Sequence, residues 1–314
     1  MSKVSDKLIE NYENYMSQVN DLPDNACSLS KVILDENSTF SKSKDERKEG
    51  DIGIDGIYIT QHQIAMKWFM KLILSNEGSG LFPGQESLGN FSCIDVGSQV
   101  PFVATMAAFA NFIVVDPALN LGKEGWGSVP DLGLTFVDNE GQNLSFINEN
   151  TMCIVTSMHA IEHFGLGRYG DSIDPLGDIR AIQEFNRILR VGGWFIGSAP
   201  IVKEGDEHVS FHKNRLYSVN VLRNLLENNG FEILEDIVAT TTDAIKKTVA
   251  NYGGGGEYTF SANYITPIEY EKAILYWQDK KLEKANSEEL TNTDSAYIWL
   301  ARKKPAQEAN LENE

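Results

Sequence analysis

Histidine and carboxylate side chains that could carry out chemistry gather in residues 159–178, HAIEHFGLGRYGDSIDPLGD. The first five of these residues have the spacing H-x-x-E-H, which is found in the inverted zinc proteases. Zinc chemistry of that kind needs both histidines on one helical face and a third ligand further along the chain. Here the motif follows an apolar run and leads into glycines, so it cannot lie on a long helix. We therefore do not expect zinc hydrolysis.

Two of these side chains fit a ligand pocket better. His159 directly follows residues 151–158, TMCIVTSM, which are apolar enough for a buried strand. Ligands of open α/β sheets bind in the crevice outside the carboxyl ends of the strands. We expect His159 to line that crevice as a catalytic base and Glu162 to contact the substrate. For His163 the sequence leaves two roles open, that of a pocket residue and that of a structural residue.

The loop at residues 165–178 allows two interpretations. In the functional one it closes over a substrate that Arg168 and Tyr169 contact, while Asp171 or Asp174 binds a substrate hydroxyl or a divalent cation. Asp171 is then also a candidate catalytic residue, as a metal ligand or an orienting group. In the structural interpretation the later aspartates start the next helix and the remainder is a well-packed loop.

A second group of candidates lies in residues 210–218, SFHKNRLYS, after the following predicted strand. This segment reaches the same edge of the sheet. His212 is a candidate base or acceptor ligand, and Arg215 is a candidate substrate contact. The alternative is that His212 is an ordinary loop residue.

A strand–helix–strand unit in residues 91–116 must position these groups. Its strands are expected at residues 91–96 and 112–115 and its helix at 102–110, and the near-continuous apolar strands are typical of a parallel pair. Gly97 at the first strand end lets the backbone approach a ligand. Asp116, about 20 residues further on at the tip of the second strand, can accept hydrogen bonds from two ribose hydroxyls. The unit predicts a site for a nucleoside-containing cofactor, although the phosphate fingerprint G-x-G-x-x-G is absent.

Strands and helices alternate along the remaining chain, which predicts an α/β doubly wound sheet. Further strands are expected at residues 134–138, 151–158, 194–200, 231–239 and 296–304. One helix is expected to begin with Asp178 as its cap and to end at Val191-Gly192-Gly193, and another lies between the cap Ser218 and Gly230. The strand at 296–304 alternates in polarity like a half-exposed antiparallel strand.

The domain organisation follows from composition. Residues 1–56 are polar and predict a mobile or loosely helical arm, and residues 57–304 form the folded domain. Within it, residues 240–295 are a polar, glycine-bearing insertion, and residues 305–314 are a polar tail.

The helix expected at residues 57–75 has apolar side chains at i, i+4 and i+8, so it packs on the core as an N-terminal helical cap. An alternative role is that Tyr58, Gln61 or His62 at its start face the ligand.

Several motifs in order resemble those of the class I S-adenosylmethionine-dependent methyltransferases. They are IDVGS at 94–98, Asp116, EGQNLSF at 140–146, SMHAIEH at 157–163 and EFNRILRVGGWFIGSAP at 184–200. The resemblance implies a Rossmann-like, seven-stranded, mostly parallel sheet with an antiparallel last strand. Residues 159–178 also resemble the signature of an uncharacterised, methyltransferase-like family of unknown function.

The resemblance implies roles for individual cofactor-binding residues. Gly97 and Ser98 would pass the methionine part of S-adenosylmethionine, Asp95 would stand near its ammonium group, and Asp116 would accept the ribose hydroxyls. Glu140 would accept the adenine amino group while the Gly141 N–H meets a ring nitrogen, and His159 would also line the cofactor site. For Asp116 and Glu140 the alternative is a solvated acid.

The chain departs from the family pattern at three positions. Gln99 and Pro101 replace the second and third glycines of the usual first motif, and Glu140 replaces the usual aspartate. These changes bear on cofactor binding and not on the fold.

The composition of the chain limits the kinds of partner that we expect. The net charge of −18 disfavours nucleic acid, because an acidic surface repels phosphates. No run approaches the ~18 apolar residues of a membrane helix, the first residues do not form a signal peptide, and three cysteines are too few for a disulfide framework. We expect a cytoplasmic location and a small-molecule or glycan acceptor. The formation of a homo-oligomer is left open.

The sequence thus predicts a methyltransferase that uses S-adenosylmethionine, with O-methylation of a small polar or carbohydrate acceptor as the reaction that suits histidines and aspartates. A catalytically silent methyltransferase fold that acts as a binding or assembly module is the alternative. A nucleotide-dependent dehydrogenase is weakened by the missing phosphate-binding glycines.

Overall fold

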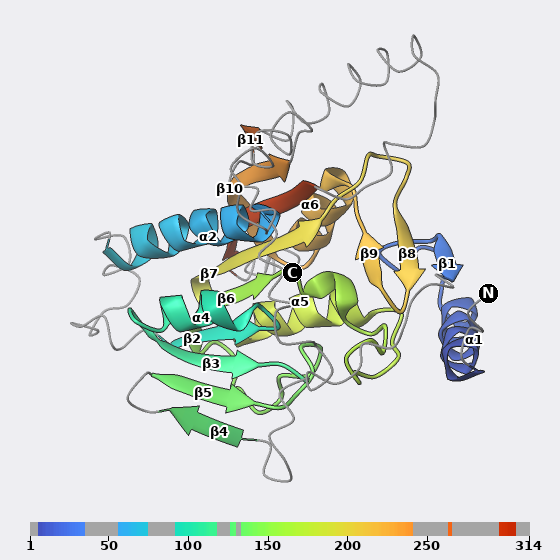
Figure 1. The fold of residues 1–314 in the computed structure, drawn as a ribbon, viewed down its shortest axis with the longest axis horizontal. Coiled ribbons are helices and arrows are strands. Elements are labelled where there is room, and N and C mark those ends of the chain that lie inside the picture. Colours follow the sequence, from blue (N-terminus) through green and yellow to red (C-terminus); the bar gives the residue numbers. More distant parts are fainter. Residues whose placement is uncertain are drawn as a thin grey trace, which may run out of the picture.

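The structure is a computed structural model that describes residues 6–34, 56–74, 92–117, 126–129, 133–240, 263–265 and 295–305. In this part of the chain the central feature is a twisted sheet of nine strands in the order β11-β10-β12-β7-β6-β2-β3-β5-β4 (Figure 1). The strands are β2 (Ser92–Val96), β3 (Asn111–Val115), β4 (Trp126–Val129), β5 (Leu134–Val137), β6 (Met152–Met158), β7 (Leu189–Pro200), β10 (Phe231–Thr240), β11 (Asn263–Ile265) and β12 (Ser295–Lys303).

Seven of these strands form the predicted α/β arrangement. Strands β5, β3, β2, β6 and β7 pair in parallel, and β12 lies antiparallel between β7 and β10. Strands β4 and β11 extend the two edges by antiparallel pairing. The Rossmann-like sheet with an antiparallel last strand is therefore confirmed, and so is each strand of the 91–116 unit.

Strand β12 differs from the prediction of a half-exposed strand. Residues 296–301 are buried, and Trp299 and Tyr297 are 0% exposed. The alternation in polarity did not report burial, because β12 sits between two other strands and has hydrophobic clusters on both faces. Trp299 fits only because its neighbour in β7 is Gly197, where a Cβ atom would lie 2.4 Å from the indole ring.

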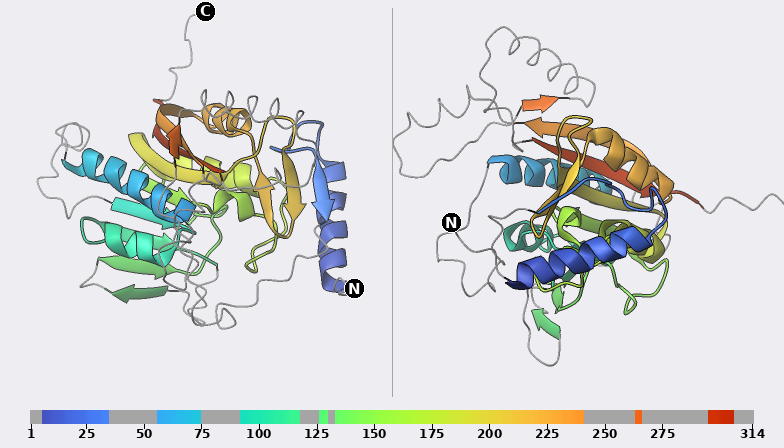
Figure 2. Two further views of the ribbon diagram at one scale, coloured as in Figure 1. Left: turned by 45° about the horizontal axis from the view of Figure 1, so that its top comes forward. Right: turned by 90° about the vertical axis from the view of Figure 1, so that its right-hand side faces the viewer.

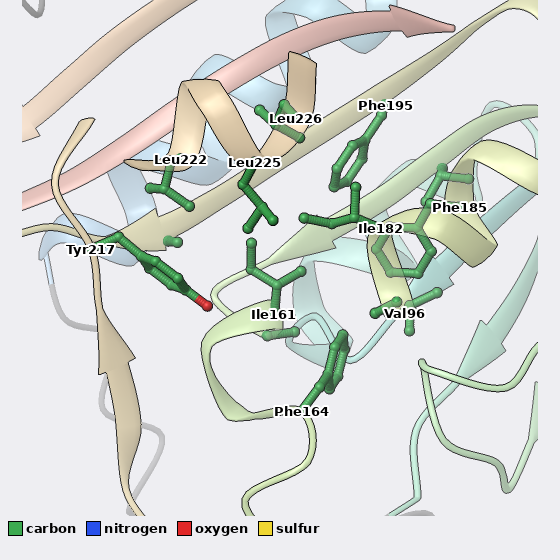
Figure 3. Close-up of a cluster of buried hydrophobic side chains, with 14 of the residues drawn as sticks. Val96, Ile161, Phe164, Ile182, Phe185, Phe195, Tyr217, Leu222, Leu225 and Leu226 are labelled. Atoms are coloured by element: carbon green, nitrogen blue, oxygen red, sulfur yellow. The ribbon is translucent and has the colours of Figure 1, made fainter. Parts of the chain in front are cut away.

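Helices cover the two faces of the sheet. The cluster on one face includes α2 (Gly56–Leu74) and α4 (Val100–Met106), which confirms the expected helix at 57–75. The cluster on the other face includes α5 (Gly177–Ile188) and α6 (Val219–Asn228). In that second cluster Ile161, from the loop after β6, lies between Ile182 of α5 and Leu225 of α6 (Figure 3).

A small lobe stands beyond the carboxyl ends of the parallel strands (Figure 1). It consists of α1 (Asp6–Asp21) and a sheet of β1 (Val32–Leu34), β8 (His208–Phe211) and β9 (Asn214–Leu216). In the right-hand view of Figure 2, which looks from this side, α1 crosses in front of the sheet.

Helix α1 is firmly packed on the sheet of the lobe. Leu8 and Tyr15 are each 1% exposed, and the Tyr15 ring centroid lies 5.0 Å from that of Phe211. Residues 6–21 of the predicted arm are thus helical and packed against β8, and the mobility expected of the arm stays a prediction. The remainder of the predicted arm, the GGGG run at 253–256 within the insertion and the tail lie outside the described residues.

The ends of two helices test the predicted caps. Helix α6 is capped as expected, since the Val221 N–H donates to Ser218 Oγ at 3.3 Å and Gly230 follows the helix with φ 85°. The capping role predicted for Asp178 is wrong, because α5 begins one residue earlier, after Leu176, which makes no side-chain cap bond. Helix α5 also ends at Ile188 rather than at residues 191–193, since β7 already starts at Leu189.

Candidate functional site

The tip of β2 makes a tight turn that depends on glycine. Gly97 has φ 77°, and a Cβ atom there would lie 2.9 Å from the Cβ of Ala160 in the loop after β6. Helix α4 starts at Val100, so Pro101 occupies its first turn, where the missing N–H breaks no helical bond. The replacement of the third motif glycine by proline is therefore compatible with this backbone.

Asp95 is buried beneath this turn and holds it in shape. One carboxylate oxygen accepts from the Ser98 N–H at 3.1 Å, and the other accepts from the Thr156 hydroxyl at 2.6 Å. Ser98 Oγ in turn accepts from the Met158 N–H at 2.9 Å, which ties the turn to β6. Burial raises the pKa of Asp95 to about 7, partly offset by these hydrogen bonds.

Asp116 lies at the tip of the neighbouring strand. Val96 and Val115 are partners in the β2–β3 ladder, so Gly97 and Asp116 follow at the same level. Asp116 is half-buried, and its charge contributes to the raised pKa of Asp95, so the two carboxyl groups are close. An acidic side chain and a glycine thus stand side by side at adjacent strand ends, as expected.

His159 stands at the tip of β6 in a left-handed conformation with φ 52°. Its N–H donates to the carbonyl and hydroxyl oxygens of Ser198 in β7, at 3.0 and 3.2 Å. The short 3₁₀ helix Ile161–His163 follows, in agreement with the expectation that the H-x-x-E-H motif is not on a long helix.

Glu162 joins the two histidines of the motif. Its side chain is 1% exposed, and Oε1 lies 3.3 Å from His159 Nδ1 and 3.7 Å from His163 Nε2. Burial acts to raise the pKa of Glu162, but His163 and His159 outweigh it and hold that pKa below its usual value. Burial lowers the pKa of His163 to about 4 despite the carboxylate.

Helix α2 brings polar side chains over the same strand ends. Ser198 Oγ donates to Gln61 Oε1 at 2.5 Å, and the His62 ring stacks on Phe102 of α4 at 4.8 Å. Burial, aided by the charge of His159, lowers the pKa of His62 to about 4. Of the three positions in α2 considered as ligand-facing, Gln61 therefore contacts β7 and His62 contacts α4, whereas the Tyr58 side chain lies outside the described residues.

Ser198 and Phe102 contact these side chains and were not predicted as site residues. Each lies inside a regular element, Ser198 in an apolar strand and Phe102 in a short apolar helix. Only the register of β7 against β6 shows that Ser198 lies beside the tip of β6. No local signal marks either residue.

The acidic loop after the motif is organised around its own carboxylates. Asp171 accepts hydrogen bonds from the N–H groups of Gly165, Gly167 and Tyr169, at 2.9, 3.2 and 3.1 Å. Burial raises the pKa of Asp171 against the effect of these bonds. Asp174 accepts from the Leu176 N–H at 3.0 Å.

The loop also binds one of the predicted adenine contacts. Glu140 Oε1 accepts from both the N–H and the hydroxyl of Ser172, each at 2.8 Å. Gly141 lies against Phe164 and Val96, whose atoms would be 2.8 Å from a Cβ atom at that position. Glu140 is therefore linked to the loop.

Arg168 and Tyr169 lie toward the β8–β9 turn. Arg168 Nη1 donates to the Lys213 carbonyl at 2.8 Å, and His163 Nδ1 is 2.6 Å from the same oxygen. The Tyr169 ring packs edge-on against His163, with centroids 5.4 Å apart. These contacts hold the loop on the lobe.

His212 and Arg215 are buried in the lobe. Burial lowers the pKa of His212, whose backbone is left-handed with φ 65°. Arg215 donates to the carbonyls of Phe164 and Pro175, at 2.5 and 3.3 Å, and its Nε lies 3.6 Å from Asp178 Oδ2.

The structure therefore gathers one part of the predicted site and disperses another. At the strand tips it brings together Asp95, Gly97, Ser98, Asp116, His159 and Glu162. It places Asp171, Asp174 and Arg215 in the framework of the loop. Within the described ranges no cluster of three or more His, Cys, Asp or Glu could hold a metal ion. No helix in those ranges is long and apolar enough to cross a membrane.

Comparison with known families gives one partial match. The profile of a family described as "Caenorhabditis protein of unknown function, DUF268" matches residues 140–253. The stretch at 159–178, which resembles the signature of an uncharacterised family, lies inside this range. No curated protein matches the chain.

Several solved structures with similar folds carry the names of methyltransferases. A putative sarcosine dimethylglycine methyltransferase from Galdieria sulphuraria is 12% identical, with a TM-score of 0.45 over 78% of this chain and 86% of that one. A putative methyltransferase from Bacillus halodurans is 15% identical, with a TM-score of 0.42 over 74% and 100% of the two chains. Phosphoethanolamine N-methyltransferase 2 from Haemonchus contortus, in complex with phosphomonomethylethanolamine and S-adenosylhomocysteine, is 15% identical, with a TM-score of 0.41 over 80% and 60%.

Proposed function

We propose that the chain binds S-adenosylmethionine at the tips of β2, β3 and β6 and transfers its methyl group to a hydroxyl of a small polar or carbohydrate acceptor. The observation that carries the proposal is the pairing of Gly97 and Asp116 at adjacent strand ends. The glycine leaves room for a ligand beside the backbone, and the carboxylate is a fixed acceptor for ribose hydroxyls.

The position of this pair in the sheet supports the proposal. Strand β2 pairs with β3 on one side and with β6 on the other, so the chain order reverses there. Ligands of open α/β sheets bind at such a switch point, outside the carboxyl ends of the strands. Gln61, His159 and Ser198 add polar groups at the neighbouring tips of β6 and β7.

The chemistry required of the protein is modest. S-adenosylmethionine supplies an activated methyl group, so the chain has to align the acceptor oxygen and remove its proton. His159 is the side chain at these strand tips that suits proton removal, because imidazole is the most frequent general base of enzymes and this ring is held at the tip of β6. We assign no metal ion to the reaction.

Calorimetric titration with S-adenosylmethionine and S-adenosylhomocysteine tests the proposal. We expect binding in the micromolar range and its loss in Asp116→Ala. Asp138→Ala is the matched control, because Asp138 directly follows the next strand, β5, and is not assigned to the cofactor. The absence of binding to the unmodified chain up to millimolar ligand would refute the proposal, and so would equal effects of the two substitutions.

A catalytically silent binding module is the second candidate. It is favoured by the side chain of Glu140, which accepts two hydrogen bonds from Ser172 and so is already engaged where an adenine contact was expected. The same titration separates the two candidates. A silent module that has lost the cofactor site gives no heat with either ligand, whereas a methyltransferase binds both.

A further inference from the structure

Glu162 is a buried acid with an uneven set of partners. Oε1 faces Nδ1 of His159 and Nε2 of His163, at 3.3 and 3.7 Å. Oε2 is buried and finds no hydrogen-bond partner among the described residues. Both neighbouring histidines act to keep this carboxyl group ionised. An ionised carboxylate can only accept hydrogen bonds, so the proton in the contact with His159 must come from Nδ1.

This contact decides the tautomer of His159. In a neutral imidazole one ring nitrogen carries the proton and the other carries a lone pair. If Nδ1 donates to Glu162, the lone pair lies on Nε2, and Nε2 is the atom able to take a proton from a hydroxyl. The second ring nitrogen of a catalytic histidine is commonly fixed in this way.

The backbone holds the two groups in place. The His159 N–H is bound to Ser198, and Ile161, between the two residues, is inserted among Ile182 and Leu225 of the adjacent helices (Figure 3). The 3₁₀ turn therefore has little freedom to separate Glu162 from His159. A left-handed residue that is not glycine is uncommon, and such strain gathers at functional sites.

The pairing of His163 is different. Its Nδ1 faces the carbonyl of Lys213, which can only accept, so Nδ1 carries the proton there too. The distance from its Nε2 to Glu162 is too long for a hydrogen bond. Glu162 is therefore directed to His159.

We infer that Glu162 is a positioning residue that fixes His159 as the Nδ1–H tautomer and stabilises its imidazolium form, so that the site is built for hydroxyl acceptors. This inference rests on the proposed function. The acceptor hydroxyl proton passes to Nε2 of His159, the oxygen bonds to the methyl carbon, and the electron pair of the broken methyl–sulfur bond stays on sulfur. The products are a methyl ether, S-adenosylhomocysteine and an imidazolium that faces Glu162.

Nitrogen-15 NMR of the full chain, labelled at histidine, tests the inference without any cofactor. In the unmodified protein we expect Nε2 of neutral His159 to have the nitrogen-15 chemical shift of an unprotonated imidazole nitrogen. In Glu162→Ala we expect the Nε2–H tautomer to dominate. In Glu162→Gln the side-chain oxygen still accepts from Nδ1–H, so the Nδ1–H tautomer is retained.

Two further histidines sense the charge of His159. They are His62 of α2 and His163 of the motif, so their signals are followed in the same spectra. His208 is the internal reference, because its Nδ1 faces the backbone carbonyl of Asp206 on the exposed β8 hairpin. Its tautomer should be the same in all three proteins.

Two results would overturn the inference. One is an Nε2–H tautomer of His159 in the unmodified protein, and the other is an unchanged Nδ1–H tautomer in Glu162→Ala. If Glu162→Ala fails to fold, the tautomer of the unmodified protein still decides. Titration with S-adenosylhomocysteine is a separate measurement in which Glu162→Gln should bind like the unmodified chain. Calorimetry therefore tests cofactor binding, and NMR separately tests the pairing of Glu162 with His159.

Discussion

Asp178→Asn should destabilise the chain by about 3–5 kcal/mol, because it leaves the buried guanidinium of Arg215 without its counter-charge. Both residues are 0% exposed, and Arg215 Nε lies 3.6 Å from Asp178 Oδ2. The same carboxylate oxygen accepts from Ser28 of the α1–β1 connection at 2.5 Å and from Tyr217, the residue after β9, at 3.0 Å. The substitution therefore weakens the junction between the lobe and the sheet domain.

Burial and not distance sets this magnitude. The ion pair between Arg180 and Asp174 is shorter, at 2.9 Å, but the Arg180 side chain is 57% exposed. Water and salt screen such a pair, so we expect Arg180→Ala to change the free energy of unfolding by less than about 1 kcal/mol. This variant is the matched control, since it removes an ion pair of the same chemistry from the adjoining turn.

A double variant isolates the charge term. Asp178→Asn combined with Arg215→Met removes both charges and leaves no unpaired ion. We expect the double variant to be less destabilised than the sum of the single variants, by about 1–3 kcal/mol. Some destabilisation should remain, because the carbonyls of Phe164 and Pro175 lose their donor.

Urea-induced unfolding, followed by circular dichroism, measures these differences. The reasoning fails if Asp178→Asn is no more destabilised than Arg180→Ala, or if the single variants are additive. In either case the buried pair would make no special contribution to the junction.

Three further predictions follow from individual side chains. Because burial raises the pKa of Asp95 to about 7 in the folded chain, the folded state binds the extra proton, and the free energy of unfolding should fall as the pH rises from ~4 to ~7, by up to about 1.4 kcal/mol per pH unit. Denaturation at a series of pH values should show a smaller slope in Asp95→Asn, and equal slopes would contradict this account. Gly97→Ala should destabilise the fold by about 1–3 kcal/mol and weaken the binding of S-adenosylhomocysteine, since alanine is strained at φ 77° and contacts Ala160. An affinity that calorimetry finds unchanged would argue against the site. Gly197→Ala should destabilise the chain by about 1–3 kcal/mol and so lower the midpoint of thermal unfolding, because its methyl group would overlap Trp299. An unchanged midpoint would show that β12 can shift.

The strands could be predicted because most are short apolar runs between turn residues. Strand β6 is mostly apolar, and every residue of it is buried. Strand β12 shows the limit of the method, since its alternating pattern suggests a solvent-exposed face. Its burial depends on α2 and on neighbours from residues 189–200 and 231–240, which no local pattern reports.

The position of a candidate site residue could be predicted where that residue ends a strand. Asp116 and His159 are such residues, and parallel strands bring their tips to one edge. Arg215 and Asp178 show why the remainder could not be predicted. A guanidinium in a polar segment is usually exposed, and here it is buried by a helix and a loop from distant parts of the chain.

The two interpretations of residues 159–178 describe different ends of one segment. At its start, His159 and Glu162 lie after the tip of β6, where the buried carboxylate faces Nδ1 of His159. Further along, Asp171 binds three backbone N–H groups of its own loop, so its charge is needed to shape the loop. The turn at Lys213 meets the loop from the other side and holds His163. The density of polar residues that marks this segment therefore arises because a rigid framework must be built directly beside the groups that would do the chemistry.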